Sequence, residues 1–106
     1  MPREKFQTLT EQMFYILLCL REECCGMDIH DRVAAMTAGR VGIGSGTLYT
    51  LLEQFVEEGM IRGTKVEGRR RSYILTAKGR TILEEEYDRL CRRVEDYQRM
   101  MEEGSL

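Results

Sequence analysis

Three consecutive arginines, Arg69 to Arg71, are the residues of this sequence whose type and spacing most clearly imply chemistry. The stretch from Arg62 to Arg80 holds seven basic residues and one acid, a local charge of +6, although the whole chain carries a formal net charge of −2. Arginine's planar guanidinium suits two-pronged contacts to phosphate. No acid nearby in the sequence neutralises all three, so we expect their partners to be phosphates of a polyanion. On charge alone, a solvated charge run on a hairpin explains the pattern equally well.

The other chemistry-bearing residues form no catalytic or metal-binding pattern. The cysteines include no CxxC pair and His30 is the only histidine, so we interpret the cysteines as buried or half-buried free thiols, with a thiol switch as the alternative. The glycines at 39–46 lack the GK[ST] ending of a phosphate-binding loop. Neither a serine–histidine–acid set nor paired carboxylates are evident. We therefore expect no enzyme, no metal and no cofactor.

Length and composition predict one small domain with an extra helix. The chain has 106 residues, of which 42% are hydrophobic, enough for a small core. The longest apolar run, residues 13–20, is too short to cross a bilayer, and the polar N-terminus lacks a signal-peptide core. We expect a cytoplasmic protein with no membrane partner.

Two helices are predicted in the first forty residues. Thr8 and Glu11 fit a capping box that opens an amphipathic helix, which we expect to end near residues 24–26. Ile29, Val33 and Met36 then repeat at helical spacing until shortly before residue 39, and a brief extended piece at 40–41 follows.

A third helix is predicted at residues 45–58, capped by Ser45 or a neighbour. One arc of this helix is apolar and comprises Leu48, Leu51, Leu52, Phe55 and Val56. The opposite arc carries Thr47, Thr50 and Gln54 and has no charge at its N-terminal end. The helix therefore offers a neutral hydrogen-bonding surface at its start, although an ordinary solvated face gives much the same pattern.

A β-hairpin and a long helix complete the chain. Residues 60–66 and 70–76 read as two strands joined by a turn, with the arginines at the tip and on the second strand. A helix capped by Thr76 is predicted over 77–103. Its apolar residues step by alternating intervals of four and three, as in a coiled coil: Leu83, Tyr87, Leu90, Val94, Tyr97 and Met101. So narrow a stripe on so long a helix predicts self-association.

These elements predict a mainly α (α+β) winged helix-turn-helix fold, with a two-stranded wing and a long C-terminal dimerisation helix. In that fold the third helix enters the major groove of DNA and the wing reaches the phosphate backbone. We divide the chain into a DNA-binding domain at 1–76 and a dimerisation helix at 77–106.

Three segments of the sequence resemble the PadR family of bacterial transcriptional regulators: "ILLCLREECCGMDIHDRV", "GSGTLYTLLEQFVEEGMI" and "GRRRSYILTAKGR". The chain is similar to the shorter subgroup, which has a single C-terminal helix. The resemblance implies a homodimer that represses transcription and reads a palindromic DNA operator. It places DNA contacts at Thr47, Tyr49, Arg70 and Arg71. To these we add Ser45, at the amide-rich start of the third helix, Thr50 and Gln54 from the helical wheel, and Arg69 from the arginine run.

Two alternatives accompany this reading. A winged helix that binds another protein instead of DNA would share these features. A small-molecule effector could also occupy a pocket between the first and last helices. The residues that would line this pocket are Met13, Phe14, Leu17, Tyr87 and Cys91. We favour the simpler interpretation that these residues form the core of the dimer interface. A ligand there, or oxidation of Cys91, would shift the dimer and so change the spacing of the recognition helices.

Overall fold

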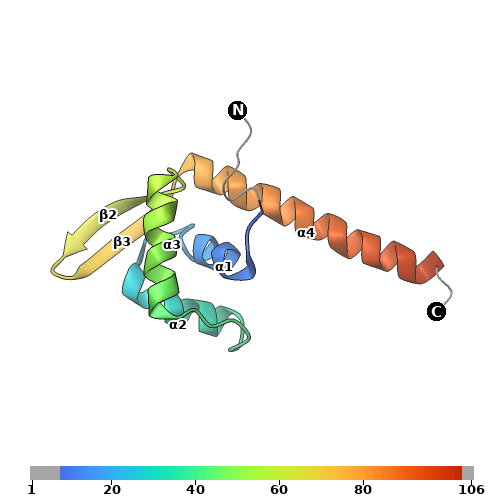
Figure 1. Cartoon of the computed structure of the whole chain (residues 1–106), viewed down its shortest axis with the longest axis horizontal. Helices are drawn as coiled ribbons and strands as arrows, with labels where there is room; N and C mark the ends of the chain where they lie inside the picture. The colour runs from blue at the N-terminus through green and yellow to red at the C-terminus, as the bar shows by residue number, and fades with distance from the viewer. Residues whose placement is uncertain (1–7, 104–106) are drawn as a thin grey trace.

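The computed structural model describes residues 8–103 and confirms the mainly α, winged helix-turn-helix architecture (Figure 1). A small domain carries the wing, which is the hairpin of β2 and β3, and the long α4 extends away from it. The elements in order are α1 (Glu11–Cys19), β1 (Cys24–Cys25), α2 (Gly26–Met36), α3 (Ser45–Glu57), β2 (Ile61–Glu67), β3 (Arg70–Leu75) and α4 (Ala77–Glu103).

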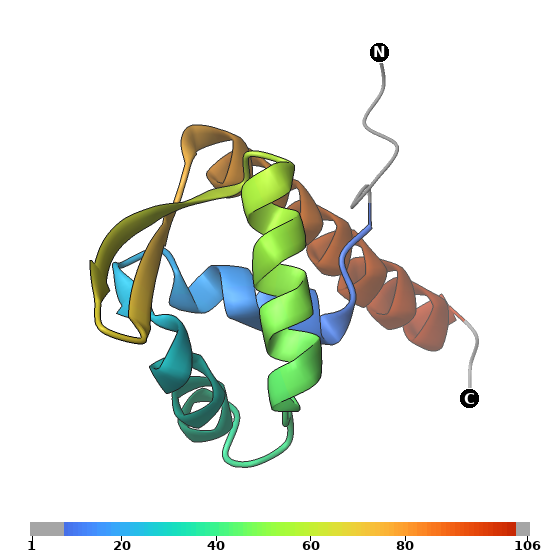
Figure 2. The same cartoon turned by 60° about the vertical axis from the view of Figure 1, so that its left-hand side comes forward.

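The core is formed by the apolar faces that the helical periodicity predicts. Ile16, Leu17, Ile29 and Phe55, from the first three helices, have no exposed surface. The same cluster includes Ile82 from the start of α4, so the first turns of α4 belong to the domain core. In Figure 2 the wing stands beside α3 and runs into the start of α4.

The predicted limits of α1 are wrong at both ends. Thr10, and not Thr8, is the N-cap, and its Oγ1 accepts a hydrogen bond of 3.2 Å from the Met13 amide. The helix ends at Cys19 because the chain turns to meet the sheet, where the carbonyl of Leu20 accepts a 2.8 Å bond from the Leu75 amide. Leu20 and Leu75 are 55 residues apart in the sequence, so no local pattern reveals this hydrogen bond.

The sheet has three antiparallel strands in the order β1-β3-β2, where the sequence predicted two. Cys24 pairs with Tyr73 and Cys25 pairs with Ser72, so β1 extends the sheet from the inner edge of the wing. A two-residue strand has no measurable period, which is why this segment was predicted to be helical. On the other side of β3, the register with β2 shifts between Gly63 and Lys65, a β-bulge in the wing.

Side chains, and not a strand, fix the connection between α2 and α3. The extended piece predicted at 40–41 forms no ladder. Thr37 Oγ1 donates to the Val33 carbonyl at 2.8 Å and accepts from the Val41 amide at 3.1 Å. His30 Nδ1 lies 2.9 Å from the Ile43 carbonyl, to which it donates. The lone histidine is therefore a structural tie between α2 and the residues that precede α3.

α4 matches its predicted limits and changes character along its 27 residues. Thr76 Oγ1 accepts from the Gly79 amide at 3.1 Å, in agreement with the predicted cap. The buried residues of α4 are Gly79, Ile82 and Glu86, all in the first three turns of the helix. The Glu86 carboxylate accepts from the Leu9 amide and from Arg89 Nε, each at 3.2 Å, which ties the segment before α1 to α4.

Gly79 in α4 packs directly against the backbone of Met60, just before the wing. A Cβ placed there would lie 2.9 Å from the carbonyl carbon of Met60 and closer still to its oxygen. We expect Gly79→Ala to lower the free energy of unfolding by about 3 kcal/mol, because backbone must move to admit the methyl group. Urea unfolding checks this against Gly46→Ala in α3, where the added methyl meets nothing within 4 Å. A Gly79→Ala protein as stable as this control would contradict the packing described here.

Candidate nucleic-acid interface

The start of α3 is exposed, uncharged and rich in hydrogen-bonding groups. Ser45, Thr47, Tyr49 and Thr50 are exposed, and Gln54 is half-buried. The N-cap is Gly44, the residue next to Ser45, which agrees with the predicted cap by Ser45 or a neighbour, although no side chain of residues 8–103 caps this helix. The first turn has no acid. Its amides and the positive end of the helix dipole therefore face outward, a setting that favours an anion.

The opposite side of α3 fixes the helix in the domain. Leu48, Leu51, Leu52 and Phe55 are buried, as predicted. Val56 was predicted on the same apolar arc but is 44% exposed, because it faces the space between α3 and the wing instead of the core. α3 is thus held by one face while its start remains open.

Two tyrosine rings pack where α2, α3 and the wing meet. A Cβ on Gly26 would lie 3.4 Å from Cε1 of Tyr49 and 3.5 Å from Cε1 of Tyr73, so both rings lie against the start of α2. Burial raises the pKa of Tyr73 above its ordinary value, and its hydroxyl is a donor at neutral pH, as that of an unshifted tyrosine would be. Tyr73 was not among the site residues predicted from the sequence. Its position two residues after Arg71, on the same strand face, was the available signal.

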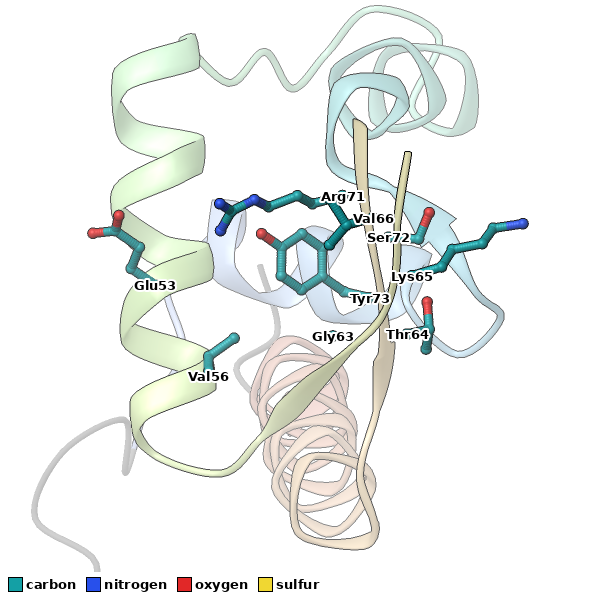
Figure 3. A pocket seen from close by; sticks show the side chains of 9 residues that line it. All are labelled: Glu53, Val56, Gly63, Thr64, Lys65, Val66, Arg71, Ser72 and Tyr73. Carbon is teal, nitrogen blue, oxygen red and sulfur yellow. The ribbon is translucent and has the colours of Figure 1, made fainter. Parts of the chain in front are cut away.

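The three arginines do not form one patch, because neighbouring side chains on a strand point to opposite faces. Arg69 and Arg71 line a hollow of about 570 Å³ together with Tyr49 and Glu53 of α3. A second hollow, of about 610 Å³, lies between α3 and the wing. Figure 3 shows Arg71 and Tyr73 directed toward α3, whereas Lys65 points away from it.

Arg70 points the other way and has an acidic partner. Its Nη2 lies 3.2 Å from Oδ2 of Asp28 in α2. The expectation that phosphates alone would neutralise the arginines is therefore wrong for Arg70. Asp28 is 42 residues away in the sequence, and the pairing of β1 with β3 brings it to the wing. No ion pair is found for Arg69 or Arg71 within residues 8–103.

The predicted seam on α4 is mostly uncovered in the single chain. Leu83 and Leu90 are half-buried, whereas Tyr87, Val94 and Tyr97 are between 55% and 65% exposed, and Met101 is 41% exposed. A hydrogen bond with the Cys91 thiol raises the pKa of Tyr87. The exposed seam of α4 could pack against another helix without rearrangement of the domain.

A hollow of about 380 Å³ lies between the start of α1 and α4, near the predicted effector pocket. Of the predicted lining residues only Phe14 borders it, beside Leu9, Tyr15 and Leu90 among others. Leu17 is fully buried in the core. Met13, Tyr87 and Cys91 lie outside its lining.

Three of the four cysteines are buried, in agreement with their interpretation as free thiols. Burial raises the pKa of Cys19 to about 11 and also raises that of Cys24. Residues 8–103 contain no group of three potential ligands that could hold a metal ion. Among the same residues, no helix is both long enough and apolar enough to cross a membrane.

The fold and the exposed surfaces define a winged helix-turn-helix protein with an appended C-terminal helix. Residues 16–85, more than half of the chain, match the model of the Transcriptional regulator PadR-like family. The chain belongs to the PadR-like family of transcriptional regulators, which confirms the resemblance found in its sequence.

Solved structures of PadR regulators share this fold. A PadR family regulator from Eggerthella lenta aligns with a TM-score of 0.72 at 22% identity, over 84% of this chain and 80% of that one. A PadR-like regulator from Bacillus cereus aligns with a TM-score of 0.67 at 25% identity, over 83% and 88%. Bacillus subtilis PadR in complex with operator DNA aligns with a TM-score of 0.60 at 25% identity, over 68% of this chain and 44% of that one. Comparison with curated protein sequences found no significant match.

The burial of Cys19 predicts slow alkylation in the native protein. With a pKa of about 11, about one Cys19 thiol in a thousand is ionised at pH 8, and the thiolate is the reactive form. We expect iodoacetamide at pH 8 to label Cys19 slowly in the folded protein and rapidly in urea, as followed by mass spectrometry of peptides. Equal rates in the two conditions would contradict the buried position.

Proposed function

We propose that this protein is a homodimeric DNA-binding repressor that reads a palindromic operator with α3 and holds the DNA backbone with its wing. The observation that carries the proposal is the open, uncharged start of α3 beside a wing that bears Arg69 and Arg71. The match to the PadR-like family supports it, as does the likeness to Bacillus subtilis PadR, which was solved with operator DNA.

The two parts of the interface have different tasks in this proposal. Thr47, Thr50 and Gln54 supply neutral hydroxyl and amide groups for base edges in the major groove, where glutamine pairs well with adenine. Tyr49 contributes an aromatic ring beside them. The wing arginines and the amides near Ser45 hold phosphates, which fix the position of the protein but carry no sequence information.

Dimerisation in this proposal uses the exposed seam of α4. From Tyr87 onward this helix leaves the domain core for about 25 Å, at 1.5 Å per residue. The alternation of four- and three-residue steps suits the packing of a second helix. A dimer would hold two copies of α3 apart by about one turn of DNA, on the order of 34 Å, and so set the spacing of the operator half-sites.

The salt dependence of binding should identify the phosphate contacts of the wing. If each half-site makes on the order of four phosphate contacts, the dimer shows a log–log slope of affinity against salt of roughly −7. Arg71→Ala should flatten this slope by about 2, one contact per subunit. Arg92→Ala removes the same charge from an exposed position of α4 outside the basic stretch and serves as the control. Equal slopes for wild type and Arg71→Ala would show that Arg71 does not touch phosphate.

A charge placed in the seam should separate the dimer. Val94 is 55% exposed in the single chain, and Val94→Lys would put two ammonium groups into the packed seam. We expect sedimentation equilibrium to give a dimer for wild type and a monomer for Val94→Lys at micromolar concentration. Gln98→Lys adds the same charge outside the seam and should remain dimeric. Persistence of the Val94→Lys dimer would remove α4 as the contact.

The central test is a titration with two duplexes, one of random sequence and one from the region upstream of the protein's own coding sequence, at two salt concentrations. Tighter binding to the upstream duplex, weakened by salt, is the expected result. Absence of binding to either duplex at low salt would overturn the proposal and favour a winged helix that binds protein.

A further inference from the structure

We propose that Asp28 is an internal counter-ion of Arg70 that the DNA backbone must displace, so that Asp28 lowers the affinity of the wing for phosphate. This inference rests on the proposed DNA binding, because phosphate is the competing anion. It assigns a role to an acidic residue of α2 that lies 42 residues from Arg70 in the sequence.

The ion pair is specific in its geometry. Arg70 Nη2 lies 3.2 Å from Asp28 Oδ2, and the other terminal nitrogen of Arg70 lies 4.0 Å from the sulfur of Met27. Both acceptors belong to the first turn of α2, which begins directly after β1. Cys25 in β1 pairs with Ser72 in β3, so the sheet register places the start of α2 beside the side chain two residues before Ser72. The contact therefore follows from the backbone pairing of the wing.

The ion pair between Arg70 and Asp28 is exposed to solvent, so it holds Arg70 only weakly. The side chains of Arg70 and Asp28 are 50% and 48% exposed. Exposed ion pairs are weak, so a phosphate can replace the carboxylate as the partner of Arg70. The displaced carboxylate would remain close to the DNA backbone and repel it. Asp28 thus reduces the favourable charge that each wing brings to DNA, without preventing the contact.

Asp31 provides a matched control on the same helix. It is an exposed carboxylate three residues after Asp28 and makes no ion pair with any of the described residues. Asp31→Asn therefore measures the general effect of removing one negative charge from α2. Asp28→Asn removes the same charge together with the partner of Arg70 and nearly preserves side-chain size.

The experiment measures DNA affinity of full-length wild type, Asp28→Asn, Asp31→Asn, Arg70→Ala and the double variant Asp28→Asn/Arg70→Ala, with folding checked by circular dichroism. We expect Asp28→Asn to bind roughly 3- to 10-fold more tightly than wild type and Asp31→Asn to change affinity less than about 2-fold. The gain should be equal on random and upstream duplexes, because phosphate contacts carry no sequence information. In the Arg70→Ala background, Asp28→Asn should have no more effect than Asp31→Asn.

Each other outcome overturns the inference in a recognisable way. Weaker binding by Asp28→Asn would make Asp28 a residue that positions Arg70 productively. A gain equal to that of Asp31→Asn, or one that persists without Arg70, would reduce it to general electrostatics. Loss of binding by every protein, wild type included, would refute the proposed function and this inference together.

Discussion

The pairing of β3 with strands on both sides is the constraint on which the rest of this structure depends. On one side β2 completes the wing, and on the other β1 joins the sheet to the start of α2. The Leu75 amide also donates a hydrogen bond to the carbonyl of Leu20, at the C-terminal end of α1. One six-residue strand thus sets the wing relative to the first three helices. The contact between Arg70 and Asp28 and the packing of Tyr49 and Tyr73 over Gly26 follow from this register.

An overall negative charge is compatible with the proposed binding of a polyanion because the basic residues are concentrated in one stretch of the chain. The start of α3 has no acid, and the basic residues concentrate between Arg62 and Arg80. The field close to the surface, and not the net charge of the chain, is what a phosphate meets within a Debye length. Glu53 lies further along α3, in the hollows beside the wing, and would limit how far the DNA backbone enters them.

Local patterns predicted those parts of the fold that local physics determines. The apolar arc of α3, the hairpin and the full extent of α4 follow from periodicity, turn residues and the Thr76 cap. The early end of α1, the strand at Cys24–Cys25 and the partner of Arg70 were missed because each depends on a residue from 42 to 55 positions away. The sequence predicted candidate DNA contacts on α3 and on the wing, but the division of the arginines between two faces of the wing requires the strand register.

The outer edge of β2 also bears on how copies of this chain associate. An edge strand presents unpaired amides and carbonyls, which in principle invite a second sheet to add on. Here the edge carries Arg62 and Lys65, and the bulge between Gly63 and Lys65 interrupts its hydrogen-bonding pattern. Charges and bulges of this kind discourage edge-to-edge pairing. The wing can therefore extend into solvent as an open hairpin without pairing with the wings of other copies into a continuous sheet. The exposed edge of β2 is protected from aggregation in this way even when no DNA is bound.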